Sequence, residues 1–304
     1  MSKGITYHII TIVAIFSALG LGIFIGSMLN GEQLMVSHQS KLMTELGGHL
    51  KSITQESETL KKEISQLKND IGLKDQLINC IFSDYVSGRL KGYNVAIVMT
   101  GDKELSEEIS LLLQNAGANI LSVTSIMNLY QIDSISAFNQ IKPVRDDFRL
   151  NKADNITTYA AESLMYSILS GKDVDFINET ASKEYIEIQG DYSKMVDYII
   201  WVGPNQNGRE YINVVDIPML NIVKKLNIPS LIVERSSSAY SAMDIFKQSG
   251  FSTIDNIDTI YGKISMLMVM KGVQGNFGTK ESATSLLPKL SVESFKQLNL
   301  KKNN

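Results

Sequence analysis

The chain has 304 residues, of which 44% are hydrophobic and 20% are charged, and its formal net charge is −3. Because lysine and arginine are scattered along the chain and do not cluster, we expect no nucleic-acid binding. The only cysteine, Cys80, has no intrachain partner, which excludes an internal disulfide framework.

An uninterrupted apolar segment near the start predicts a transmembrane helix. Ile9 to Leu29 contains no charged side chain and has about the 20 residues needed to cross a hydrocarbon layer. A cleavable signal peptide is the alternative, but the residues that end the segment form a poor small-x-small cleavage site. Lys3 precedes the segment and Lys41 is the first basic residue after it, so the positive-inside bias places residues 1–8 in the cytoplasm. We therefore expect a single-pass protein of the cell membrane whose bulk is extracytoplasmic.

Small side chains recur every four residues on one face of this helix: Ala14, Ala18, Gly22 and Gly26. The spacing Gly22-x-x-x-Gly26 lets two helix backbones approach closely, which predicts dimerisation through this face. Glycine is also frequent in membrane helices in general, so a compositional explanation stays open.

Residues 31–82 predict a coiled coil, because apolar side chains alternate in spacings of three and four throughout this range. Leucine occupies d positions and isoleucine occupies a positions in the second half, a combination that favours two parallel strands and hence a homodimer. The central residues of this seam are Leu60, Ile64, Leu67 and Ile71.

The alternative is an amphipathic helix that packs on the chain's own globular domain. The adjacent Gly47 and Gly48 predict a kink or break in the first half of the segment.

From residue 92 to residue 289 the chain alternates between strand and helix patterns. Short apolar runs predict buried strands at 93–100, 120–125, 196–202 and 230–234. Longer patterns predict helices at 103–116, 157–170, 209–226, 239–248 and 261–271. This alternation predicts an extracytoplasmic α/β domain with a doubly wound, Rossmann-like sheet. Residues 290–304 are expected to form a polar tail.

The turn after the first predicted strand shows no signature of nucleotide binding. It reads Met99-Thr100-Gly101-Asp102-Lys103-Glu104, which lacks both the G-x-G-x-x-G and the G-x-x-x-x-G-K-[ST] patterns. All histidines and the cysteine precede the α/β domain, which removes Ser-His and Cys-His catalysis and thiolate- or imidazole-bound zinc from it. We therefore predict a protein that is not an enzyme and has no resident cofactor.

Three groups of residues are considered as metal ligands. Met35 and His38, with His49 further along, are weak candidates for Cu(I), although two ligands do not make a site. Asp255 and Asp258 offer oxygen to a hard cation, but a role as turn and cap residues leading into the next helix is the favoured interpretation.

The third group is Met266, Met268 and Met270. Soft copper ligation is one interpretation. Packing in the core is favoured, since the three lie in an apolar run and methionine readily fills cores.

Two ordered motifs at opposite ends of the chain carry a family resemblance. The first is the apolar N-terminal helix with its small residues and the predicted coil behind it. The second is the closing segment, whose motif residues are Ser252, Thr253, Asp255, Asp258, Gly262, Gly275, Gly278 and Pro288. On these residues the chain resembles the MctB/SteB family of bacterial envelope proteins, named for a mycobacterial copper transport protein. The resemblance covers nearly the whole chain, with a poorer match over residues 131–192.

The resemblance implies a role in copper transport or homeostasis, described as channel-forming in the mycobacterial member. A single helix does not enclose a pore, and copper itself is implied by the resemblance only. The first hypothesis is a copper-homeostasis membrane protein with ligands near Met35, His38 and His49. The alternative is a non-enzymatic, dimeric envelope or cell-division scaffold that binds a membrane partner, as a SteA-like protein would be.

Overall fold

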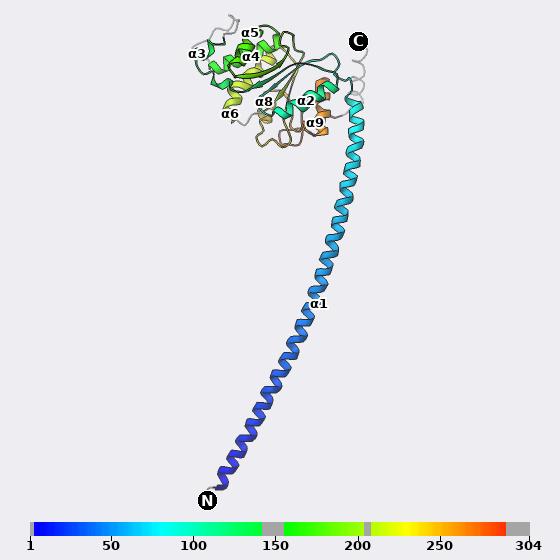
Figure 1. Cartoon of the computed structure of the whole chain (residues 1–304), viewed down its shortest axis with the longest axis vertical. Helices are drawn as coiled ribbons and strands as arrows, with labels where there is room; N and C mark the ends of the chain where they lie inside the picture. The colour runs from blue at the N-terminus through cyan, green and yellow to red at the C-terminus, as the bar shows by residue number, and fades with distance from the viewer. Residues whose placement is uncertain (1–2, 142–154, 204–207, 290–304) are drawn as a thin grey trace. The chain divides into compact units, whose positions relative to one another are not determined.

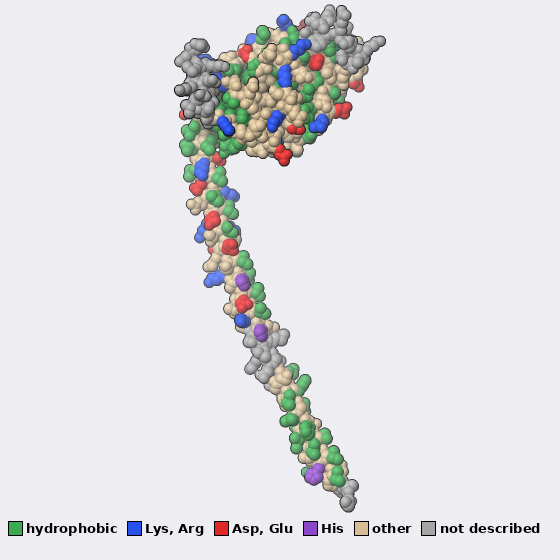
Figure 2. All heavy atoms as spheres, turned by 180° about the vertical axis from the view of Figure 1, so that it is seen from behind, with side chains coloured by type: hydrophobic (Ala, Val, Ile, Leu, Met, Phe, Trp, Pro, Cys, Tyr) green, Lys and Arg blue, Asp and Glu red, His purple; other side chains and the backbone are tan. Residues whose placement is uncertain are grey.

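The computed structural model describes residues 3–141, 155–203 and 208–289, and it divides the chain into two compact units, Met1–Cys80 and Ile81–Asn304. The first unit belongs to one helix, α1 (Lys3–Val86), shown in blue to cyan in Figure 1. Gly4–Met28 is long and apolar enough to cross a membrane, and none of it is buried. Figure 2 shows green apolar side chains along this stretch and charged side chains farther along the helix.

The helix runs through Gly47 and Gly48 without interruption, so the break expected there is absent. Each glycine costs about 1 kcal/mol relative to alanine, and the good helix formers on both sides outweigh that cost. The predicted membrane helix and the predicted coil are therefore segments of one helix. Pairing of that helix with a second one stays a prediction.

In the second unit, the described residues form one seven-stranded sheet with the order β3-β2-β1-β4-β5-β6-β7. The strands are β1 (Asn94–Met99), β2 (Asn119–Ile126), β3 (Ile186–Gly190), β4 (Tyr198–Val202), β5 (Ser230–Val233), β6 (Ser252–Ile254) and β7 (Asn276–Phe277). All neighbouring pairs are parallel except β2 and β3, which are antiparallel. The four predicted strands are confirmed as β1, β2, β4 and β5.

Helices cover both faces of this sheet (Figure 1). The face of Ala96 and Trp201 is covered by η1 (Leu129–Gln131), α3 (Ile135–Phe138), α4 (Ile156–Ser170), α5 (Val174–Ser182), α6 (Gly208–Tyr211), α7 (Ile217–Lys225) and α8 (Met243–Gln248). The opposite face, that of Ile97 and Ile200, packs against α2 (Lys103–Asn115), α9 (Ile260–Met270) and the end of α1 at Val86. The predicted α/β architecture with a mainly parallel sheet is confirmed.

One predicted helix, 209–226, is interrupted by a π-helical segment, η2 (Ile212–Asp216). Pro218 lacks an N–H, so the carbonyl of Val214, four residues earlier, loses its α-helical donor. The hydroxyl of Thr158 on α4 donates to that carbonyl at 3.1 Å. A side chain from another helix thus replaces the missing bond, and this is a tertiary effect that local pattern does not reveal.

Candidate functional site

The parallel strands all end at one edge of the sheet, which is where ligands bind in open α/β folds. The strand order reverses between β1 and β4, and the turn after β1 leads directly into α2. Asp102 caps that helix, because its Oδ1 accepts the N–H of Leu105 at 2.9 Å. A carboxylate therefore occupies the turn where a nucleotide-binding fold would present glycine N–H groups to phosphate.

Arg235, two residues after the end of β5, connects this turn to α2. Its guanidinium donates to Asp102 and, at 2.8 Å, to Glu108 on α2. The bond to Glu108 and the pair with Asp102 raise the pKa of Arg235, against an opposing effect of burial. The cation is thus already paired with two carboxylates of its own chain.

Glu234, at the end of β5, is only 1% exposed. Its Oε1 accepts the ammonium of Lys280 at 2.7 Å and the hydroxyl of Ser241 at 2.6 Å. Burial raises the pKa of Glu234, while the bonds from Lys280 and Ser241 oppose that shift. Lys280 also donates to the carbonyls of Arg235 and Ser238. Its ammonium group therefore has three acceptors, one of which is Glu234.

The motif residue Asp255 holds the segment that follows β7. Its carboxylate accepts the backbone N–H groups of Thr279 at 2.7 Å and Lys280 at 3.0 Å. Gly278 makes this approach possible, since a Cβ on it would lie 1.8 Å from Oδ1 of Asp255. Its φ of 146° is also one that residues with a side chain rarely adopt.

Asp258 fixes the loop after β5, because it accepts the backbone N–H and the hydroxyl of Ser236, each at 2.7 Å. Burial acts against ionisation, but these two bonds prevail and lower the pKa of Asp258. The residue that caps α9 is Thr259, whose hydroxyl accepts the N–H of Gly262 at 3.1 Å. The expectation that Asp255 and Asp258 cap this helix is therefore wrong, because both carboxylates are occupied by more distant backbone donors.

Two of the remaining motif residues, Ser252 and Thr253, join β6 to β7. Ser252 accepts the N–H of Gly275 at 3.2 Å, and Thr253 donates to Asn276 at 2.9 Å. Gly262 lets α9 approach the end of β6, since a Cβ there would lie 2.1 Å from a backbone oxygen. Pro288 lies at the end of the described residues. The motif of the closing segment thus builds the last two strands and the charged network beside them.

The candidate copper ligands on α1 do not converge within one chain. His38 and His49 are exposed and are separated by eleven residues, which corresponds to about 16 Å along a helix. The side chain of Met35 lies outside the described part of the molecule. Among the described residues, no three His, Cys, Asp or Glu side chains are grouped so that they could hold a metal ion. Cys80 is a free, exposed thiol.

The three methionines of α9 are core residues. Met266, Met268 and Met270 are between 0% and 3% exposed, and Met266 and Met270 pack in the layer that covers Ile97. The packing interpretation is confirmed.

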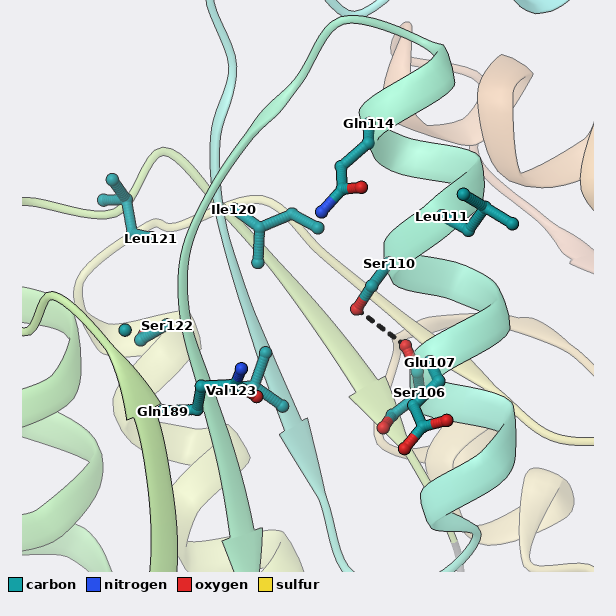
Figure 3. Close-up of a pocket in the computed structure, with 11 residues that line it drawn as sticks. Ser106, Glu107, Ser110, Leu111, Gln114, Ile120, Leu121, Ser122, Val123 and Gln189 are labelled. Carbon is teal, nitrogen blue, oxygen red and sulfur yellow. Dashed lines mark hydrogen bonds between the residues drawn. The ribbon is translucent and has the colours of Figure 1, made fainter.

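Two hollows border the described part of the α/β unit. The larger, of about 550 Å³, lies between α2 and the strands β2 and β3. Figure 3 shows Gln114, Ser110 and Glu107 along its helical wall, with Ile120 and Val123 on the strand side. The smaller, of about 440 Å³, is lined by residues that include Tyr130, Glu210 and Tyr211. The sequence alone predicts neither hollow, because the lining residues come from separate segments that only the fold brings together.

A family model described as Copper transport outer membrane protein, MctB, matches residues 4–288. No curated protein matches the chain.

Proposed function

Since this chain belongs to the copper transport MctB family, we propose that it is a single-pass envelope protein that serves copper transport or homeostasis. In this proposal the N-terminal end of α1 is the anchor and the α/β unit is an extracytoplasmic, non-enzymatic binding module. The copper role is carried by the family match over residues 4–288, and the anchoring by the helix itself: Gly4–Met28 is apolar enough to span a membrane, and the same helix continues to Val86.

The charged network at the carboxyl edge supports a binding role over catalysis. Arg235 and Lys280 are each bonded to carboxylates of the same chain, and Asp255 and Asp258 are occupied by backbone donors. Oε2 of Glu234 has no partner among the described residues, but it is buried, and a general base must reach its substrate. The network instead stabilises the loops that a partner protein would meet.

The native thiol provides the test of topology. Cys80 is exposed and lies on α1 beyond the apolar stretch. A thiol reagent that does not cross membranes should label Cys80 in intact cells and should not label a Cys80→Ser variant. Labelling that requires cell lysis would contradict the extracytoplasmic placement of the α/β unit.

Copper binding is tested on the full chain in detergent. Met35, His38 and His49 are the weak candidate ligands that the sequence offers, so an anaerobic Cu(I) titration against a chromogenic chelator compares the natural chain with the variant Met35→Leu/His38→Ala/His49→Ala; competition that only the variant loses would assign copper binding to these residues. Met127→Leu, which changes an exposed methionine of the α/β unit, is the matched control. The copper tolerance of a deletion strain is measured in parallel. If the chain does not compete for Cu(I) but the deletion strain is copper-sensitive, copper handling through a partner is favoured. Unchanged copper tolerance of the deletion strain would contradict the function in copper homeostasis.

The second candidate is a dimeric envelope or cell-division scaffold that engages a membrane partner, and the exposed apolar side chains of α1 favour it. Leu60, Ile64, Leu67 and Ile71 are between 51% and 60% exposed on the single chain. Such a continuous seam calls for a second helix. Leu60→Lys/Leu67→Lys should abolish dimers and partner capture without altering metal titrations. Dimers that survive this change would have to be held by the face of Gly22 and Gly26.

A further inference from the structure

We infer that α1 pairs with a second copy of itself in parallel and in register, and that charged residues beside the apolar seam specify both features. The inference rests on the anchored, dimeric arrangement proposed above and adds its geometry. It depends on Glu56, Lys61, Glu63 and Lys68, which flank the seam, and on Lys74 within it.

The seam fixes where the charges lie. With Leu60 and Leu67 at d positions, Glu56 and Glu63 are g residues. The e residues that follow are Lys61 and Lys68. In a parallel, in-register pair, each g residue lies beside the e residue five positions later on the other helix. Glu56 therefore meets Lys61 of the second copy, and Glu63 meets Lys68 of the second copy, on both sides of the coil.

An antiparallel arrangement would reverse this complementarity. It places g residues beside g residues and e residues beside e residues, so that Glu56 and Glu63 would face carboxylates while Lys61 and Lys68 would face ammonium groups. All four side chains are exposed on the single chain. In the described part of the chain no ion pair is recorded for any of them, which leaves them available to a partner helix.

The register is specified by a polar residue within the seam. Lys74 occupies a d position, and a d side chain packs beside the e residue of the facing heptad. In register, that residue is Asp75 of the second copy, and the g-to-e rule also places Asp75 beside Asp70 of the first copy, so Lys74 lies next to two carboxylates that would otherwise repel each other. A shift by one heptad would instead bring Lys74 of one chain beside Lys68 of the other. A single charged seam residue of this kind sets register at a cost in stability.

A second copy is the occupant that these observations specify. The uncovered side chains Leu60, Ile64, Leu67 and Ile71 require a helix with the same apolar period. The flanking charges require that helix to present lysine where this one presents glutamate, and the reverse. The chain itself meets both conditions only in the parallel orientation.

The orientation is tested on the full chain by disulfide formation. In a Cys80→Ser background, Ile53→Cys and Leu67→Cys are each expected to cross-link a residue to its own equivalent. An antiparallel pair aligns at most one position with itself, and a shifted pair aligns none. Cross-linking at only one of the two positions, or at neither, would overturn the parallel, in-register arrangement.

The charge pairs are tested by exchange. Glu56→Lys/Glu63→Lys and Lys61→Glu/Lys68→Glu should each dimerise at least about 10-fold more weakly than the natural chain, since exposed pairs contribute modestly and here turn repulsive. Mixing the two variants, carrying different tags, should restore dimers that contain one copy of each. Equal dimerisation of either variant alone, or no recovery on mixing, would refute the role of these charges.

A second readout separates this inference from the proposed function. Gly22→Leu/Gly26→Leu tests pairing through the apolar stretch and leaves the coil unaltered. If this change abolishes dimers and the charge exchanges do not, the coil inference fails while the anchored function stands. If the disulfides form as expected but a deletion strain keeps unaltered copper tolerance, the proposed function fails and the register stands.

Discussion

The buried carboxyl group of Asp216 makes the stability of the α/β unit depend on pH. Asp216 lies at the end of η2 and is 0% exposed. Neither carboxylate oxygen has a hydrogen-bond partner among the described residues. Burial raises the pKa of Asp216 well above its ordinary value of 3.8. The group is therefore protonated in the folded chain at pH values where the unfolded chain ionises it.

The sign and size of the effect follow from proton linkage. Between pH 3.8 and the raised pKa, the folded state holds one more proton than the unfolded state, so the free energy of unfolding falls as the pH rises. The slope for one proton is about 1.4 kcal/mol per pH unit. Asp216→Asn removes this slope with little change of shape. The free energy of unfolding of the variant, minus that of the natural chain, should therefore increase by about 2.7 kcal/mol across two pH units within that window.

The only tryptophan, Trp201, supplies the assay, because it is fully buried in β4 and reports on the α/β unit within the full chain. Denaturant titrations followed by its fluorescence should be run from pH 4 to pH 8. Asp244→Asn, the same change at an exposed position on α8, is the matched control. A constant difference between Asp216→Asn and the natural chain over this range would refute the reasoning, since it would mean that the carboxyl group is ionised in the folded state.

Three further changes test the carboxyl edge and the π-helical segment with the same assay. Gly278→Ala should lower the free energy of unfolding by at least about 3 kcal/mol more than Gly272→Ala. Both glycines have positive φ, but only Gly278 lies against a carboxylate. Equal losses would show that small side-chain movements relieve the clash. Lys280→Met should cost about 3 to 5 kcal/mol, since it leaves Glu234 buried without its cation, and adding Glu234→Gln should recover most of that loss; no recovery would assign the loss to packing. Thr158→Val should cost about 1 to 3 kcal/mol, because it removes the donor to the carbonyl that proline leaves unpaired, and an unchanged midpoint would indicate that another donor takes over.

The sequence predicted what depends on local pattern. The long apolar helix and the central strands follow from continuous apolar runs, and Val95 to Met99 and Tyr198 to Val202 are buried as such runs require. The strands at the two edges of the sheet were harder to predict. β6 has three residues and β7 has two, too few for any period to emerge, and the antiparallel β3 alternates a glutamate and a glutamine with its isoleucines.

The charged network was beyond local pattern for a different reason. Asp255, Asp258 and Thr259 lie in one short polar stretch, and all three residue types favour helix starts. Only the arrangement of β5, β6 and β7 decides that Thr259 caps the helix while the aspartates bind backbone groups on other segments. The motif residues were recognisable as a set, but their roles were not.

The late position of Lys280 in the chain sets the order of events during synthesis. Glu234 and Asp255 leave the ribosome well before the ammonium and the N–H groups that satisfy them. Until Lys280 emerges, closing the sheet would bury acids without donors, which is strongly unfavourable. The contacts that satisfy Glu234 and Asp255 therefore form only after Lys280 has been made, well after the strands that carry the two acids.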